Sequence, residues 1–572
     1  MATQIERILA PSRGLNTFDA PHAVAKNQAP ALKNFIPGQN GRVAGRNSIR
    51  GTSANLTPAV AAAGMTTTGL VDSTCAVFPF GELLVVSSDA KTSVFDPTSA
   101  TPVATQSTHG LYFWGGSGEV QDKIFVINEA ASPAELNSIT ASGTFNVLTS
   151  APKNPTYVFS YLDALWTFGG RDTPAASTTD RPSTLFFTNP GTTIDASATP
   201  WQTDGLTNMI QVGSSVSEGV AAVPFKRSVL LLKEDSVYQL IGTAPENFEV
   251  RLISDGVKIE HGIVPASSEQ FVYFKTTLGV YRWDGTSIAP MPVASREAVR
   301  EASEISYMGY GRILFGGPAG SFVYDENSDA LTEITYHGNR PNEGVPESEA
   351  DNPAVEQSLF RVVRVNTTVG CYGLVGTYTE GFGMSDRSFV SVYTGAVEGR
   401  ASISLADSGY KDASLAAGTY GSSDTAVVYY FRSPTVRSTS PLKAMRLARL
   451  YVDYYCQTAV MSDAGANSAS DDSDNHPFLY VRVLSESGET LLAETALPSQ
   501  GTATSLQRKR AIFELSGAEA AEYYVEIYSK EANNLKTSPD YQTGNLIYAD
   551  PTTLELHDVW VEYEEAQRRV AV

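Results

Sequence analysis

A short strand pattern that ends in Val-Tyr recurs at a fixed interval in the middle of the chain. Its tyrosines are Tyr238, Tyr281 and Tyr324, and 43 residues separate each from the next. A unit of β-strands that returns about every 40 to 50 residues has the length of a β-propeller blade. One blade cannot bury both faces of its sheet, so blades have to pack around a common axis. The repeat therefore predicts an all-β chain that contains a β-propeller.

A β-sandwich with evenly spaced hairpins is the alternative interpretation of the same repeat. The position 43 residues before Tyr238 is Asp195, in a loop-like sequence, so the interval reveals three blades only. Further Val-Tyr pairs, at Tyr393 and Tyr429, do not follow the interval. On the propeller interpretation, insertions separate the earlier blades.

The sequence divides into three parts, as expected for a chain longer than one core can serve. Residues 1–60 are rich in Pro, Gly, Asn and Ala and keep no period, which predicts an extended N-terminal arm; a frayed terminus is the alternative. Residues 61–345 alternate apolar β-formers with turn residues and are expected to form the propeller, with one short amphipathic helix over 293–305. Residues 346–572 begin in a polar linker and then alternate charged and apolar positions, which predicts an antiparallel β-sandwich or platform domain.

Composition narrows the class of protein. Apolar residues make up 42% of the chain and charged residues 18%, as in a folded protein. The formal net charge of −21 argues against a protein that grips nucleic acid through its phosphates. We expect no membrane-spanning segment and no secretion signal, because no long apolar run occurs. Cys75, Cys371 and Cys456 are odd in number and far apart, so we expect a reducing site of synthesis without a disulfide framework.

Motifs for catalysis are missing from the sequence. The six histidines never fall at metal-ligand spacing, and the phosphate-binding, dinucleotide-binding and nucleophile-elbow patterns do not occur. The acidic segment 462–477 lacks the spacing of a calcium loop, and ion binding there stays open. We therefore predict no enzyme, no cofactor and no metal site. The enzymatic alternative is a propeller that hydrolyses glycosides with two carboxylates, with Trp166, Trp201 and Trp283 lining a sugar groove.

The arm carries short motifs in a defined order: Gly14-Leu15-Asn16-Thr17, Pro21, Gln28-Ala29, Leu32, Asn34, Gly41-Arg42-Val43 and Arg46. This order resembles the opening of the tail-nozzle, or tail-hub, proteins of short-tailed bacteriophages, which begin G-[LI]-N-T, proline, Q-A, L-x-N and G-x-[LV] with an arginine. Residues 185–201 and 255–285 are similar to an aromatic strand with a Pro-Gly turn and to a closing G-V-Y-R-x-D-G in the same family. The short R-x-G after the family's arm is stretched here to residues 46–51.

This resemblance implies a structural virion protein. Such nozzles are similar in having a propeller, assembling as a homohexamer beneath the tail adaptor ring, and forming the last tube through which genome DNA passes without specific binding. The resemblance further implies assembly in the host cytoplasm, a place in the virion tail, and docking of tail fibres or of a needle or plug. The arm residues expected to contact another subunit or the adaptor are Gly14, Leu15, Asn16, Thr17, Pro21, Asn34 and Arg46.

Two other functions remain open from the sequence. One is a carbohydrate-binding or glycan-degrading propeller that acts on host surface polysaccharide, with Trp201, Trp283 and tyrosine-rich strands as stacking surfaces. The other is a kelch-like scaffold. An acidic surface suits the nozzle, because it repels DNA and so lets the duplex move.

Overall fold

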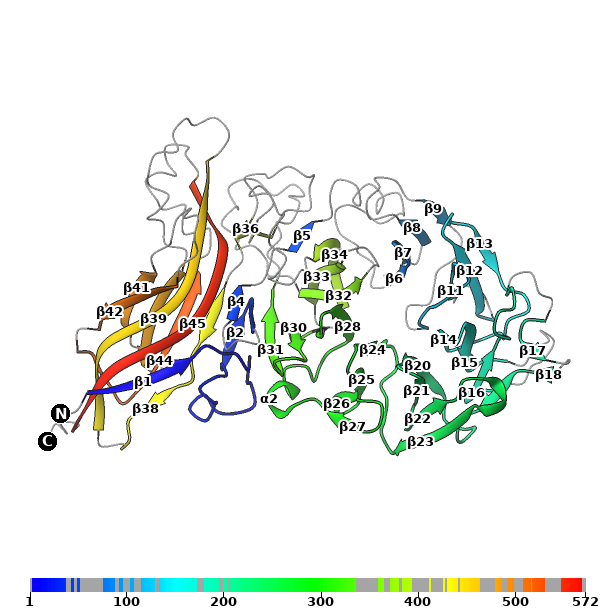
Figure 1. The fold of residues 1–572 in the computed structure, drawn as a ribbon, viewed down its shortest axis with the longest axis horizontal. Helices are drawn as coiled ribbons and strands as arrows, with labels where there is room; N and C mark the ends of the chain where they lie inside the picture. The colour runs from blue at the N-terminus through cyan, green and yellow to red at the C-terminus, as the bar shows by residue number, and fades with distance from the viewer. Residues whose placement is uncertain are drawn as a thin grey trace.

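The chain forms two bodies, a ring of small sheets and a sandwich of two larger sheets (Figure 1). The structure, a computed structural model, describes residues 3–37, 43–45, 49–51, 76–87, 92–95, 103–106, 115–128, 131, 133–171, 180–194, 199–203, 206–335, 358–364, 371–379, 383–392, 411–412, 425–426, 429–440, 443–462, 479–485, 491–497, 508–515, 517–529 and 547–567.

The ring consists, in these residues, of seven four-stranded antiparallel units, which confirms the predicted propeller. Blade 1 contains β6 (Ala76–Phe80), β7 (Leu83–Ser87), β8 (Thr92–Phe95) and β9 (Ala104–Gln106). Blade 2 contains β10 (Gly118–Val120), β11 (Lys123–Asn128), β12 (Glu135–Thr140) and β13 (Phe145–Val147). Blade 3 contains β14 (Tyr157–Tyr161), β15 (Ala164–Phe168), β16 (Thr184–Phe187) and β19 (Met209–Gln211). Blade 4 contains β20 (Gly219–Phe225), β21 (Ser228–Lys233), β22 (Ser236–Ile241) and β23 (Glu249–Asp255). Blade 5 contains β24 (Ala266–Ser267), β25 (Val272–Thr276), β26 (Gly279–Trp283) and β27 (Ile288–Pro290). Blade 6 contains β28 (Glu304–Gly309), β29 (Arg312–Gly317), β30 (Gly320–Asp325) and β31 (Ala330–Ile334). Blade 7 contains β32 (Ser358–Arg364), β33 (Cys371–Thr379), β34 (Gly383–Val392) and β5 (Ile49–Gly51).

The repeated tyrosines mark equivalent strands. Tyr238, Tyr281 and Tyr324 lie in β22, β26 and β30, the third strands of blades 4, 5 and 6. The interval breaks in blade 3 because its third and fourth strands are separated by an inserted ribbon, β17 (Gln202–Thr203) and β18 (Leu206–Thr207). An insertion therefore does precede Tyr238, but it lies inside blade 3 and not between two blades as predicted.

Blade 7 combines strands from two distant parts of the sequence. β5 of the arm pairs antiparallel with β34, and β32 contacts both β28 and β6, which closes the ring. The propeller therefore extends past the boundary predicted at residue 345, and its last strand comes from the predicted arm. Strands of a blade and of a sandwich share the same two-residue alternation, so the sequence pattern could not separate them.

The predicted sandwich is confirmed in the C-terminal part. Its first sheet contains β1 (Thr3–Leu9), β3 (Phe35–Pro37), β4 (Val43–Gly45), β39 (Lys443–Ser462), β42 (Lys509–Glu514), β43 (Glu519–Ala520) and β45 (Ile547–Gln567). Its second contains β2 (Ala31–Lys33), β37 (Tyr430–Arg432), β38 (Val436–Arg437), β40 (Leu479–Ser485), β41 (Leu491–Leu497) and β44 (Glu522–Ser529). A separate two-stranded sheet joins β35 (Lys411–Asp412) to β36 (Thr425–Ala426).

Helix is scarce in the described residues. The helix predicted over 293–305 is wrong in length: α2 spans only Val293–Arg296, and a short 3-10 turn, η1, covers Pro245–Asn247. The rest of that segment folds as turns that carry the chain from β27 to β28 while burying Val299 and Ala302. Its apolar spacing therefore reflects a buried connection rather than a helix face.

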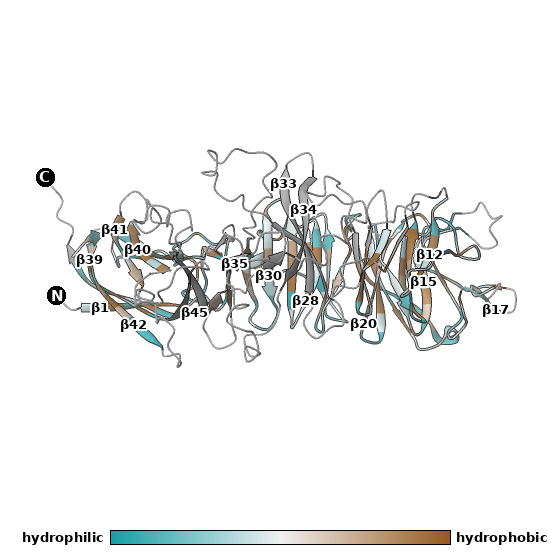
Figure 2. Ribbon diagram, turned by 90° about the horizontal axis from the view of Figure 1, so that it is seen from above, coloured by the Kyte–Doolittle hydropathy of each residue, from teal (hydrophilic) through white to brown (hydrophobic). Residues whose placement is uncertain are grey.

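The hydrophobic residues lie mainly in the strands, and the turns are hydrophilic (Figure 2). One buried cluster runs without interruption from blade 5 and blade 6 through arm residues Leu15, Leu32 and Phe35 into both sheets of the sandwich. Burying a side chain of this size stabilises the fold by about 1.5 to 3 kcal/mol. The arm is therefore part of the core that joins the two bodies.

Candidate functional site: the arm and the propeller surface

The arm strand β2 connects the propeller to the sandwich. It pairs in parallel with β31 of blade 6 and antiparallel with β37, so blade 6 and the second sandwich sheet become one ten-stranded sheet. In Figure 1 this strand lies at the junction of the two bodies. Among the motif residues of the arm, Gly14, Leu15, Leu32 and Asn34 lie on this connection.

The glycine of the first motif allows a close backbone approach. Gly14 has a φ of 71°, and a Cβ at this position would lie 2.3 Å from the carbonyl oxygen of Leu331 in β31. The amide of the next residue, Leu15, donates to that same oxygen at 2.6 Å. A glycine is required here because any side chain would separate the arm from blade 6.

Asn16 fixes the loop that follows. Its side chain is 3% exposed; Oδ1 accepts from the amides of Phe18 and Asp19, both at 3.1 Å. Nδ2 donates to Oδ2 of Asp19 at 2.9 Å and to Oε1 of Gln28 at 2.8 Å. The G-L-N-T and Q-A motifs therefore contact each other through Asn16 and Gln28. In the sequence, the only sign of this contact was that both motifs occur together in the resemblance.

Asn34 anchors the far end of β2. It is fully buried with a φ of 60°, a left-handed conformation that asparagine tolerates better than most residues. Its amide donates to the carbonyl of Glu333 at 2.8 Å, and its side chain exchanges two hydrogen bonds with Thr335, of 2.9 and 3.0 Å. The L-x-N motif thus binds the arm to the end of blade 6.

The other arm residues have different surroundings. Thr17 is exposed, the carbonyl of Pro21 accepts from the amide of Thr435 at 3.0 Å, and Arg46 lies outside the described residues. The structure thus shows Gly14, Leu15, Asn16 and Asn34 in contact with their own chain. A contact of the arm with another subunit or with an adaptor stays a prediction.

A cavity of about 670 Å³ opens where the inner strands of blades 3 to 5 begin. Its lining includes Thr156, Asp180, Glu218 and His261. The single proton of the Thr156 hydroxyl is directed at the carbonyls of Phe168 and Gly219, at 2.8 and 2.9 Å, and not at a base. Asp180 pairs with Arg171 at 2.6 Å. Among the described residues that line the cavity, no nucleophile therefore contacts a base.

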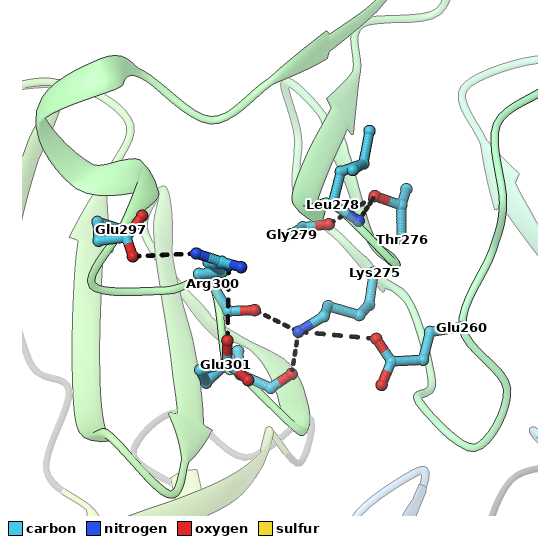
Figure 3. A network of polar contacts seen from close by, with 9 residues as sticks. Glu260, Lys275, Thr276, Leu278, Gly279, Glu297, Arg300 and Glu301 are labelled. Carbon is cyan, nitrogen blue, oxygen red and sulfur yellow. Dashed lines mark hydrogen bonds and ion pairs between the residues drawn. The ribbon is translucent and has the colours of Figure 1, made fainter.

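Lysines inside the blades tie loops together. Lys275 is 7% exposed; its Nζ donates to the carbonyls of Arg300 and Ala302 and lies 3.7 Å from Glu260 (Figure 3). Lys233 is fully buried and donates to the carbonyls of Val212, at 2.9 Å, and Ser214. Burial lowers the pKa of the Lys233 ammonium. These lysines hold the connections between blades. In the sequence, a single lysine within an otherwise apolar strand could have pointed to each of them.

The carboxyl of Glu326 lies in the turn that follows β30 of blade 6. Oε1 of Glu326 accepts from the hydroxyl of Tyr273 at 2.8 Å and from that of Ser268, while Oε2 is buried without a partner among the described residues. Burial raises the pKa of this carboxyl above its usual value.

The tryptophans proposed for a sugar groove are in the core. Trp166 and Trp201 are 1% exposed and Trp283 is fully buried. Trp166 stacks on Phe187, with ring centroids 4.5 Å apart. Their role as stacking surfaces for a glycan is therefore wrong, and they pack blades instead.

Two absences hold for the described part of the chain. No group of three or more His, Cys, Asp or Glu side chains there is arranged to hold a metal ion, and no helix there is long and apolar enough to cross a membrane. The acidic residues 463–477 and the side chains of Cys75, Cys371 and Cys456 lie outside it.

Comparisons with known proteins return similarity of fold only. No family model and no curated protein matches the chain. Among solved structures, BamB from Moraxella catarrhalis has a TM-score of 0.32 at 12% identity and covers 55% of this chain and 96% of its own. The Pan2 WD40 domain of Neurospora crassa has a TM-score of 0.32 at 11% identity, covering 57% and 90%, and the AfRom2 CNH domain has 0.33 at 8%, covering 56% and 94%. The strands and blades of the structure itself make the chain an all-β protein built on a β-propeller.

Proposed function

We propose that this chain is a structural subunit of a short-tailed phage tail, forming a nozzle ring beneath the tail adaptor through which genome DNA leaves. The observation that carries the proposal is the arm. Motif residues Gly14, Leu15 and Asn34 bind the arm to blade 6, and β2, which lies between them, also pairs with the sandwich. Because these residues share one structural role, the short motifs that contain them occur together.

The fixed joint between the two bodies supports this role. A tail component has to keep its parts at constant angles while DNA passes, and a shared sheet does this through backbone hydrogen bonds on both sides of β2. A shared hydrophobic cluster strengthens the same joint. Domains joined by a flexible linker alone would move relative to each other.

The charge of the chain also supports the proposal. Each copy carries a formal charge of −21, and DNA carries about one negative charge per 1.7 Å of duplex. An acidic passage repels the duplex instead of binding it, so the DNA keeps moving. Fibres and a needle or plug are further partners under this proposal.

The proposal is tested by assembly. The purified chain, alone and mixed with the adaptor ring of the same phage, is analysed by sedimentation velocity and electron microscopy. We expect a closed ring with a passage wide enough for duplex DNA. A chain that stays monomeric in both conditions would contradict the proposal, and binding on a glycan array would instead favour a carbohydrate-binding role.

A further inference from the structure

The outer face of the first sandwich sheet carries a row of large side chains. Arg7, Trp560, Tyr451 and Ile512 lie directly opposite one another on the adjacent strands β1, β45, β39 and β42. Residues directly opposite in a sheet point to the same face. Ile5 and Ile512, on the two outer strands, are 65% and 56% exposed. We call this surface, with Arg510 added, the platform face.

The composition of the platform face is that of a binding surface. The guanidinium of Arg510 lies 4.7 Å from the centre of the Trp560 ring, and that of Arg7 lies 5.9 Å from it. Trp, Tyr and Arg are the residues most enriched where protein interfaces concentrate their binding energy. Exposed isoleucines on both flanks add apolar area that a monomer does not need.

Ion pairs hold the platform face in one conformation. Asp453 is 2% exposed and accepts two hydrogen bonds from Arg510, of 2.7 and 3.0 Å. Arg508 lies 2.6 Å from the same carboxylate, and Arg7 lies 2.9 Å from Asp558. Side chains fixed in this way lose little conformational freedom when a partner binds, which favours association.

The charge balance of this face indicates what binds there. In the ion pairs of this face, four arginines, at positions 7, 449, 508 and 510, lie among four carboxylates, at positions 453, 514, 558 and 562, so these paired charges balance on a chain of net charge −21. Two copies of so acidic a chain repel each other over most of their surfaces, and a face on which arginines neutralise these carboxylates reduces that cost. Nucleic acid would require cations without carboxylate partners.

We propose that the platform face binds a second copy of this chain and is the contact that closes the ring. Among the described strands, β1 pairs only with β45 and β42 only with β39, so both edges beside the face are also open to a neighbour. A cyclic ring uses two different faces at each contact, so the platform face meets another surface of the next copy. This inference rests on the proposed function, because the ring is the assembly in question.

The test compares Ile512→Glu and Trp560→Ala with Leu252→Glu in the full chain. Leu252 lies on β23, the outer strand of blade 4, and is 55% exposed, so its variant adds the same charge at a matched position. We expect Ile512→Glu to sediment as a monomer, Trp560→Ala to associate at least about tenfold more weakly, and Leu252→Glu to form rings like the wild type. Thermal unfolding of the monomers checks that each variant is folded.

The outcomes separate the two ideas. A wild type that forms rings while Ile512→Glu forms them equally well would overturn the role of the platform face and leave the nozzle proposal standing. Equal loss of rings in Ile512→Glu and Leu252→Glu would also overturn it, because added charge alone would then explain the effect. A wild type that stays monomeric, even with the adaptor ring, would overturn both.

Discussion

At the scale of single residues, the arm depends on two backbone positions with positive φ. Gly14 and Asn34 hold left-handed conformations at 71° and 60°, and each lies against blade 6. Such conformations are costly for most residues, so the amino acid at each position is set by geometry. This accounts for the glycine and the second asparagine in the arm motifs.

We predict that Gly14→Ala is more destabilising than Gly191→Ala. Both glycines have a φ of 71°, but a Cβ at Gly191 meets nothing within 4 Å, whereas one at Gly14 meets the Leu331 carbonyl. The free energy of unfolding should fall by about 1 kcal/mol in the control and by about 2 kcal/mol or more beyond that in Gly14→Ala. Urea unfolding of the two variants measures the difference, and equal losses would contradict the close approach.

We predict that Glu326→Gln changes the pH dependence of stability. Burial raises the folded pKa of Glu326 above 4.5, so the wild type gains stability from the protonated carboxyl below pH 4.5 and loses it as the pH rises through the folded pKa. The glutamine variant does not ionise, so its free energy of unfolding should increase relative to the wild type from pH 4 to pH 7. Urea unfolding across this range checks it. The exposed Glu246→Gln is the matched control for the loss of one carboxylate, and a flat difference for Glu326→Gln would refute this prediction.

At the scale of elements, the strand repeat could be predicted and the domain boundary could not. The third strands of blades 4 to 6 were visible through Tyr238, Tyr281 and Tyr324, because each unit has nearly the same loop lengths. The pairing of β5 with β34 joins residues more than 300 positions apart, and no local pattern records such a contact. For the same reason the arm motifs could be found in the sequence, but their contacts with β31 could not.

We predict that Leu32→Ala uncouples the two bodies. Leu32, 1% exposed at the centre of β2, packs in the cluster shared by blade 6 and the sandwich. Its truncation should lower stability by about 2 to 5 kcal/mol and split the thermal transition of the joined sheet into two. Differential scanning calorimetry measures both effects. Leu206→Ala, at a residue that is 75% exposed, is the control, and the same loss there would speak against a specific role for β2.

At the scale of the whole molecule, one ten-stranded sheet makes the propeller and the sandwich a single unit. This suits a ring subunit, since a contact made on the sandwich then also fixes the orientation of the blades. The platform face lies on the sandwich and the cavity on the propeller, so the two surfaces belong to different bodies of this unit.

The position of the arm also sets the order in which a newly made chain folds. Strand β5 needs β34, and β1 needs β45, so these two arm strands stay unpaired until residues near 390 and 560 have been translated. A propeller without its seventh blade would present two unpaired blade edges, and such exposed edges favour aggregation or recruit chaperones. Folding of the arm is therefore tied to the translation of β45.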